Sequence, residues 1–229
     1  MTVLSIVNQT DAGPGLFGDA AAARGVELTE WVPSAAPLPA GRWDGVLVLG
    51  GAMQLDQTDR HPWLHDVHAT IESALADGVP TLGVCLGGQM VALAAGGTVG
   101  PAREPERGWK EIVLLPEART DRLLGVLEGD RVMTFQGHSY AFTTPPGGVT
   151  LAHSDVCEQA FRVGDAAWGI QFHPEATVPT LELWIAEMQL AEDTRPLLLA
   201  ETRRRADYAR TLAGTLFGAF LDVVAARTP

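Results

Sequence analysis

Apolar residues in the first half of the chain form short runs separated by amphipathic segments. Residues 2–7 are rich in β-branched side chains, residues 26–31 alternate between apolar and polar positions, and the run 44–49 is apolar after Asp44 and is followed by Gly50 and Gly51. Each of these patterns is typical of a strand. A strand without polar alternation is typically central and covered on both faces. The run 44–49 is therefore the predicted centre of a sheet.

Helical patterns lie between these runs. An alanine-rich segment follows Gly18, and residues 62–77 carry an apolar face between Pro62 near the start and Gly78 just past the end. A third helix follows the predicted strand end at 79–82 and stops at Gly96. Strands that alternate with helices in this way predict a parallel sheet.

The pattern changes in the second half of the chain. Short predicted strands separated by turns indicate hairpins added beside the parallel sheet; they cover 108–115, 131–135, 149–152, 157–163 and 167–172. From residue 178 the chain is predicted to be helical, with one helix over 180–192 and a second, long one after it. The expected fold is α/β: an open, mostly parallel, doubly wound (flavodoxin-like) sheet with helices on both faces, antiparallel hairpins and C-terminal helices. We expect a single domain over 1–229, with 178–229 as its C-terminal helical part.

Cys85 lies on the predicted turn between a buried strand and the third helix. Small residues surround it in the segment Gly83-Val84-Cys85-Leu86-Gly87-Gly88-Gln89. Such a turn lifts a nucleophile clear of the sheet edge, and the helix N-terminus beside it favours a thiolate and an oxyanion. Taken alone, the same pattern also fits a buried cysteine in a packing turn.

A nucleophilic cysteine needs a base and a group that orients the base. Among six histidines, His173 is the best candidate for the base, because it directly follows a predicted apolar strand and Glu175 comes two positions later. Pro174 fixes the backbone between them, so both side chains can project to one side. Gly50 and Gly51, at the end of the central predicted strand, can present backbone N–H groups at the same sheet edge.

Two other motifs compete for a functional interpretation. The segment 13–18 matches G-x-G-x-x-G, but five residues separate it from the first strand, so a plain glycine-rich loop is favoured over a nucleotide site. His61, His65, His68 and Glu72 form a stripe that could bind a metal. A solvated helix face is the favoured explanation for the stripe, because it lies off the apolar face. Cys157 is expected to be a packing residue.

The composition limits which binding partners and which cellular compartment are expected for this protein. A net charge of −12 argues against nucleic acid or an anionic membrane as a partner. Two cysteines make no disulfide framework, and the N-terminus lacks a basic region and a cleavage site. We expect no apolar stretch of the roughly 20 residues that span a bilayer. We also expect a cytoplasmic protein without a metal or cofactor.

The ordered motifs resemble those of the class I glutamine amidotransferases of the triad type, over about residues 44–176, and among them the stand-alone GMP synthase-like domains. The stretches that carry the resemblance are Gly50-Gly51-Ala52-Met53, Gly83–Gln89, Gly108-Trp109, Phe135-Gln136-Gly137-His138-Ser139, Gln159-Ala160-Phe161 and Gln171-Phe172-His173-Pro174-Glu175.

The resemblance implies a role for each matching residue. Cys85 would attack the side-chain amide of glutamine, His173 would transfer protons, and Glu175 would orient His173. Water would then hydrolyse the γ-glutamyl thioester. The backbone N–H groups of Gly51 and Leu86 would form the oxyanion hole. The implied substrate contacts are Gly50, Gln89 and the backbone around His138, Ser139 and Tyr140.

The sequence also departs from the family pattern and leaves alternatives open. Ala52 stands where many relatives have proline. No P-loop pattern is present, so a separate synthase or ligase is expected to receive the ammonia, and self-association is the other possible assembly. A hydrolase of another γ-glutamyl amide or peptide would share the same residues. A catalytically silent regulatory module is the third hypothesis, against which the intact triad positions argue.

Overall fold

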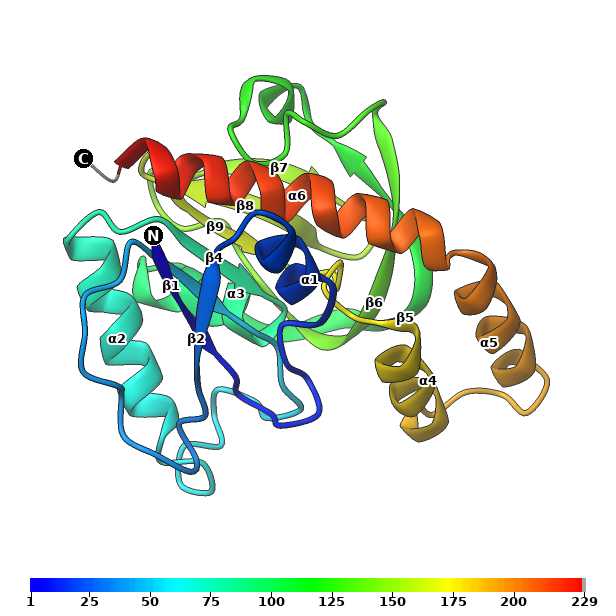
Figure 1. The fold of residues 1–229 in the computed structure, drawn as a ribbon. Coiled ribbons are helices and arrows are strands. Elements are labelled where there is room, and N and C mark those ends of the chain that lie inside the picture. The colour runs from blue at the N-terminus through cyan, green and yellow to red at the C-terminus, as the bar shows by residue number, and fades with distance from the viewer. Residues whose placement is uncertain (228–229) are drawn as a thin grey trace.

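In the computed structural model, which describes residues 1–227, nine strands form one mixed sheet (Figure 1). Their order across the sheet is β2-β1-β3-β4-β9-β8-β7-β5-β6. The parallel half contains β1 (Thr2–Ile6), β2 (Glu27–Trp31), β3 (Gly45–Val48), β4 (Thr81–Val84) and β9 (Ala167–Ile170). The antiparallel half contains β8 (Glu158–Val163), β7 (Val149–His153), β5 (Val99–Leu114) and β6 (Arg131–Phe142).

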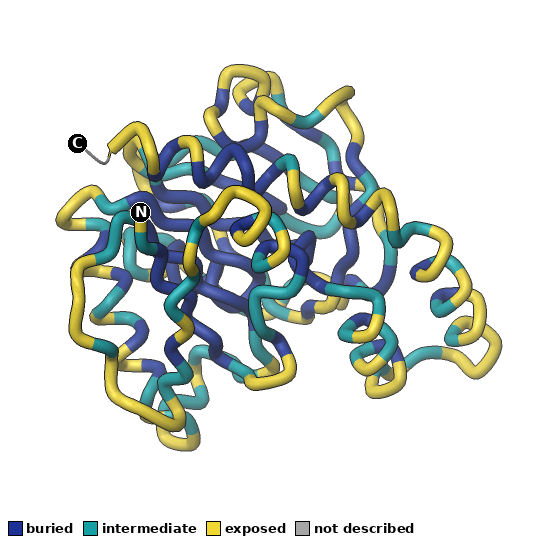
Figure 2. Tube along the Cα trace, viewed as in Figure 1, coloured by how far each residue is buried: buried dark blue, intermediate teal, exposed yellow. Residues whose placement is uncertain are grey.

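Helices cover both faces of the parallel half. The helices in the described chain are α1 (Gly15–Ala23), α2 (Leu64–Ala76), α3 (Leu86–Ala94), α4 (Val178–Glu187), α5 (Thr194–Arg204) and α6 (Ala206–Arg227), with a 3₁₀ turn at Pro116–Thr120. Helices α1 and α6 pack on one face, where the rings of Phe17 and Phe217 stack with centroids 4.6 Å apart. Helices α2 and α3 pack on the other face. The buried residues accordingly gather around the sheet (Figure 2).

This arrangement confirms the predicted fold class. Strand β1 lies between β2 and β3, so the strand order reverses at β1 and β3. Open α/β sheets bind ligands at such a reversal, outside the carboxyl ends of the strands. The segments that follow β1, β3 and β4 therefore meet at one edge of the sheet.

The antiparallel strands β5 and β6 are longer than the pattern predicted. The predictions over 108–115 and 131–135 cover only parts of them. The first seven residues of β5 are exposed or half-buried and include Pro101, so they show no apolar alternation. The ladder between β5 and β6 shifts register between Pro101, which pairs with Tyr140, and Glu106, which pairs with His138. Ser139 therefore has no partner in this ladder.

The C-terminal part also differs from the prediction. The helix expected over 180–192 spans Val178–Glu187, and it ends because Met188 adopts an extended backbone with φ −61° and ψ 137°. A separate helix, α5, precedes α6. Its sequence pattern is weak because its buried positions are only Leu198 and Thr202.

Helix α6 is long and apolar enough to cross a membrane by length and composition, which corrects the expectation that no such stretch exists. However, 61% of that stretch is buried inside the protein. Its apolar side packs against α1 and the sheet, and a buried core helix passes the same test of length and composition.

The start of α3 lies directly against the backbone of the sheet. A Cβ atom on Gly87 would stand 2.0 Å from the carbonyl oxygen of Val48 in β3, and one on Gly83 would stand 2.3 Å from the carbonyl oxygen of Gly87. Both contacts involve backbone atoms, so no side chain can move to relieve them. Only glycine permits this close approach, which places the helix N-terminus over the ends of β3 and β4.

We predict that Gly87→Ala lowers the free energy of unfolding by about 3 kcal/mol or more, because the added methyl group overlaps the backbone of β3. The matched control is Gly214→Ala in α6, where an added Cβ meets nothing within 4 Å. Alanine there should raise stability by about 0.5–1 kcal/mol through helix propensity. Urea denaturation measures both values, and equal effects at the two positions would contradict the packing account.

Candidate active site

Cys85 connects β4 to α3 in a strained backbone conformation. Its φ of 51° and ψ of −110° make it the one residue other than glycine with a positive φ among residues 1–227. Such a conformation costs about 1–3 kcal/mol and persists only where the surroundings impose it. Here the N–H of Cys85 donates to the carbonyl of Ile170 in β9 at 2.8 Å, and its own carbonyl accepts from the N–H of Gln89 at 2.9 Å.

His173 follows β9 and is buried beside Cys85. Its N–H donates to the carbonyl of Phe135 in β6 at 2.9 Å, which anchors its backbone to the antiparallel half of the sheet. Its Nδ1 lies 2.8 Å from Oε1 of Glu175, which is also buried. Because a carboxylate accepts, Nδ1 carries the proton, and Nε2 is left to face Cys85.

The pKa of His173 is raised to about 10. Burial alone would lower the pKa of the imidazole, because it disfavours the charged form. The negative charges of Glu175 and Cys85, and the hydrogen bonds of both to the ring, outweigh burial. The second oxygen of Glu175, Oε2, has no hydrogen-bond partner within residues 1–227. The imidazole is therefore the polar group that stabilises the buried carboxylate.

The glycine-rich segment 13–18 holds the backbone of Glu175. The N–H of Leu16, at the start of α1, donates to the carbonyl of Glu175 at 2.8 Å. A Cβ on Gly15 would stand 2.3 Å from that same oxygen, and the φ of Gly15 is +46°. The glycine at this position thus permits a close backbone contact with the segment that carries His173 and Glu175.

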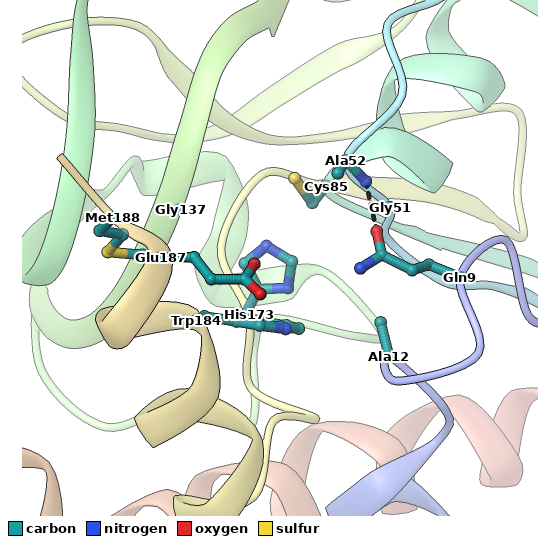
Figure 3. Close-up of a pocket in the computed structure, with 10 residues that line it drawn as sticks. All are labelled: Gln9, Ala12, Gly51, Ala52, Cys85, Gly137, His173, Trp184, Glu187 and Met188. Atoms are coloured by element: carbon teal, nitrogen blue, oxygen red, sulfur yellow. Dashed lines mark hydrogen bonds between the residues drawn. The ribbon is translucent and has the colours of Figure 1, made fainter. Parts of the chain in front are cut away.

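The loop after β3 borders the other side of Cys85. A Cβ on Gly50 would come within 3.0 Å of Cε1 of His173, so the absence of a side chain there makes room for the imidazole. The N–H of Ala52 donates to Oε1 of Gln9 at 2.7 Å (Figure 3), and Nδ2 of Asn8 donates to the carbonyl of Leu49 at 2.7 Å. Ala52, which unlike proline has a backbone N–H, thus supplies a donor through which Gln9 fixes the loop.

Two cavities meet at Cys85. One, of about 240 Å³, is lined by Cys85 and His173 together with Gln9, Ala12, Gly51, Ala52, Gly137, Trp184, Glu187 and Met188 (Figure 3). The other, of about 230 Å³, is lined by Gly51, Ala52, Met53, Gln54, Cys85, Leu86, Gln89, Gly137, His138, Ser139 and Tyr140. Most of the residues expected to bind substrate line the second cavity. Trp184 borders His173 edge-on, with ring centroids 4.8 Å apart.

Gln89 lies buried behind the second cavity. Its Nε2 donates to the carbonyl of Tyr140 at 3.0 Å and to Oε1 of Gln171 at 3.3 Å. Nε2 of Gln171 lies 3.5 Å from Sγ of Cys85. The sequence predicted no role for Gln171, which directly follows β9.

The histidine stripe and Cys157, which were also considered from the sequence, lie outside the cavities at Cys85. Of the histidine stripe on α2, His68 pairs with Glu72 at 3.6 Å, and both side chains are partly exposed. Cys157 was expected to be a packing residue, and this is wrong. Its Sγ contacts Oε2 of Glu106 at 3.4 Å, within a polar cluster. Glu106, His138 and Cys157 form the one group of potential metal ligands in residues 1–227, with ligand atoms within 4.8 Å of one another.

Comparison with known proteins identifies the class that this fold and site define. The family model for class-I glutamine amidotransferases matches residues 20–188. One subunit of a glutamine-hydrolysing GMP synthase from Ignicoccus hospitalis is 32% identical over 142 residues, which are 61% of this chain and 70% of that protein. A glutamine amidotransferase from Thermotoga maritima has a crystal structure that aligns with a TM-score of 0.85 and 25% identity, covering 98% of this chain and 97% of that one.

The chain belongs to the class-I glutamine amidotransferase family, and its function is that of a glutamine amidotransferase. It also matches longer GMP synthases. The relative from Porphyromonas gingivalis is 37% identical over 107 residues, but the chain covers only 20% of that protein. The chain therefore spans only about a fifth of that enzyme's length.

We predict that Glu175→Gln moves the alkaline limb of the pH–rate profile to lower pH and lowers kcat/KM by about 10²–10⁴-fold. The carboxylate charge is one of the causes that raise the pKa of His173, so its removal lets the imidazolium lose its proton at lower pH. The measurement is kcat/KM for glutamine from pH 5 to 10. Glu187→Gln, a change in the exposed carboxylate of the same cavity, is the matched control. An alkaline limb that stays in place in Glu175→Gln would contradict the assigned cause.

Proposed function

We propose that Cys85, His173 and Glu175 act as a catalytic triad that hydrolyses the side-chain amide of glutamine through a γ-glutamyl thioester. The observation that carries this proposal is the 2.8 Å contact between Nδ1 of His173 and Glu175, next to a cavity that His173 shares with the strained Cys85. This arrangement supports a chain order of nucleophile, base and orienting acid.

The reaction follows from the positions of these groups. Nε2 of His173 takes the proton of the Cys85 thiol, and the thiolate attacks the amide carbon. The N–H groups of Gly51 and Leu86 bind the resulting oxyanion, where loss of one donor typically costs about 3 kcal/mol. The imidazolium then protonates the leaving nitrogen, and ammonia departs as the thioester forms. Water, deprotonated by His173, attacks the thioester and releases glutamate and the thiol.

The two cavities receive different halves of the substrate. The leaving nitrogen must lie within reach of the group that protonates it, and His173 lines only the first of the two cavities. The nitrogen therefore points into the cavity bordered by Trp184 and Met188. The α-amino and α-carboxylate ends then lie in the second cavity, near Gln89 and the backbone of Ser139 and Tyr140. Gly50, which has no side chain, leaves room for the imidazole of His173.

The ammonia is delivered to a partner protein in this proposal. The relative from Ignicoccus hospitalis is described as one subunit of a glutamine-hydrolysing GMP synthase, a name that implies a second subunit. A separate synthase or ligase is the partner that fits a domain devoted to glutamine hydrolysis, and a homo-oligomer is the other assembly to test. A nucleophilic thiol suits the reducing cytoplasm. The proposed reaction requires no cofactor, metal, nucleic acid or membrane.

We predict that Cys85→Ser lowers the release of glutamate and ammonia from glutamine by about 10⁴-fold or more, as loss of a nucleophile does in other triad enzymes. Cys157→Ser, which alters the other cysteine, retains most of the activity. Both are measured as glutamate formed per enzyme, with and without added candidate synthases, because docking can raise a low basal rate. Equal, measurable activity of wild type and Cys85→Ser would refute the proposed nucleophile, and no activity in either protein under any condition would favour a silent module.

A second candidate function is hydrolysis of other γ-glutamyl amides. The cavity on the side of His173 measures about 240 Å³, whereas a molecule the size of water or ammonia occupies about 30 Å³. It therefore has room for an alkyl group on the leaving nitrogen, against Trp184 and Met188.

This candidate predicts that γ-glutamyl methylamide and ethylamide are hydrolysed with kcat/KM values within about tenfold of that for glutamine. Met188→Trp should lower the ratio of ethylamide to glutamine hydrolysis by about tenfold or more, because the larger side chain fills the cavity. Leu183→Trp, on the exposed side of the preceding helix α4, should leave the ratio unchanged. If wild type cleaves glutamine alone, this second candidate function is refuted.

A further inference from the structure

A buried polar cluster lies behind the cavity assigned above to the α-amino and α-carboxylate ends of the substrate. Its centre is Glu106 of β5, which is only 4% exposed. Oε2 of Glu106 accepts hydrogen bonds from Oγ of Ser154 at 2.9 Å and from Nε2 of Gln159 at 2.8 Å, and Sγ of Cys157 lies 3.4 Å away. The triad mechanism uses none of these groups.

The cluster keeps its carboxylate charged. Burial would raise the pKa of Glu106, but its interactions with His138 and Ser154 outweigh burial and hold the pKa below its ordinary value. The pKa of Cys157, in contrast, rises to about 12 through burial and the nearby charge of Glu106, so its thiol stays protonated. The cluster is thus an anion surrounded by donors, and Cys157 is a donor within it and not a second nucleophile.

His138 connects this anion to the cavity. Its Nε2 lies 3.3 Å from Oε2 of Glu106, and its Nδ1 lies 3.0 Å from the carbonyl oxygen of Tyr140. Both neighbouring oxygens are acceptors, so a proton on Nδ1 makes the contact with Tyr140 a hydrogen bond. At Nε2 the geometry does not satisfy a hydrogen bond, and the short distance to Oε2 of Glu106 gives an electrostatic contact.

The carbonyl of Tyr140 is a shared acceptor. It receives Nδ1 of His138 on one side and Nε2 of Gln89 on the other, each at 3.0 Å. Gln89 also donates to the side chain of Gln171, and Nε2 of Gln171 lies 3.5 Å from Sγ of Cys85. In the ladder between β5 and β6, His138 pairs with Glu106 and Tyr140 pairs with Pro101, and Ser139 between them has no partner. Because proline has no N–H, Pro101 cannot donate to the carbonyl of Tyr140, and side-chain donors hold that carbonyl instead.

We propose that the Glu106–His138 pair positions the substrate-binding segment 138–140, and through it Gln89, by holding the carbonyl of Tyr140. This inference rests on the proposed function, in which that segment contacts glutamine. His138 and Glu106 are positioning residues, because they act through the backbone of Tyr140 and contact none of the reacting atoms.

Two substitutions of His138 separate its two contacts. The amide nitrogen of asparagine takes the place of Nδ1, and that of glutamine takes the place of Nε2. His138→Asn should keep the contact with Tyr140 and raise the KM for glutamine by less than about threefold. His138→Gln should lose that contact and raise the KM by about tenfold, the typical effect of one lost hydrogen bond. Alkylation of Cys85 by iodoacetamide should proceed at the wild-type rate in both variants.

Glu106→Gln should raise the KM by less than His138→Gln does, because the imidazole loses the charge at Nε2 but keeps Nδ1 beside the carbonyl of Tyr140. Glu104→Gln is the matched control, since Glu104 lies on the same strand with an exposed side chain. In a second readout that is independent of activity, the side-chain amide of Gln89 should shift in the ¹⁵N NMR spectra of His138→Gln and Glu106→Gln. It should stay in place in His138→Asn.

The two readouts distinguish the possible failures. If wild type does not hydrolyse glutamine, the proposed function fails, and the shift of the Gln89 amide still decides the positioning role. Equal KM values and equal amide shifts for His138→Asn and His138→Gln would overturn the inference. Stoichiometric zinc in the purified protein, lost in Cys157→Ser, would also overturn it, because the cluster would then be a metal site.

Discussion

The strained backbone of Cys85 is the constraint on which the arrangement of the site depends. The thiol stands at the sheet edge because the chain turns directly from β4 into α3 at a φ of 51°. A cost of about 1–3 kcal/mol for this conformation is small beside the packing that imposes it. Glycines at 83 and 87 let the helix start lie against the sheet backbone. The N–H of Cys85 donates to β9 and its carbonyl accepts from α3, which fixes both sides of the turn.

The N-terminal segments stabilise the site from outside it. Asn8 and Gln9 hold the loop that carries Gly51, and Leu16 at the start of α1 binds the carbonyl of Glu175. Residues that follow the first strand thus link the loop after β3 to the segment after β9. The sheet order makes this possible, because β1, β3 and β4 end at the same edge. The polar cluster around Glu106 supports the opposite side, in the antiparallel half.

The sequence predicted the parallel half of the fold well. Continuous apolar runs and glycine-rich turns are local signals, and they located β3, the Cys85 turn and α3. The exposed beginning of β5 has no such signal, because its pairing with β6 decides its structure. Helix α5 buries too little to show a periodic pattern, and nothing before it predicts the extended backbone of Met188.

The polar contacts around the site were harder to predict, because they join distant positions. Glu106 and Cys157 are 51 residues apart, and Gln9 and Ala52 are 43 apart. Neither pair has a spacing rule that a single sequence reveals. Gly15 lay in a motif with a familiar nucleotide-binding pattern, yet its contact is with the carbonyl of Glu175. In each case the residue type was visible in the sequence, and its partner was not.

The most direct test of the account is detection of the covalent intermediate. The protein is mixed with glutamine, quenched with acid within milliseconds to seconds, digested and mapped by mass spectrometry. The account predicts a glutamyl group on the peptide that contains Cys85, with none on the peptide that contains Cys157. Release of glutamate with no acyl group on Cys85 at any time point, even when hydrolysis is slowed by low temperature, would contradict it.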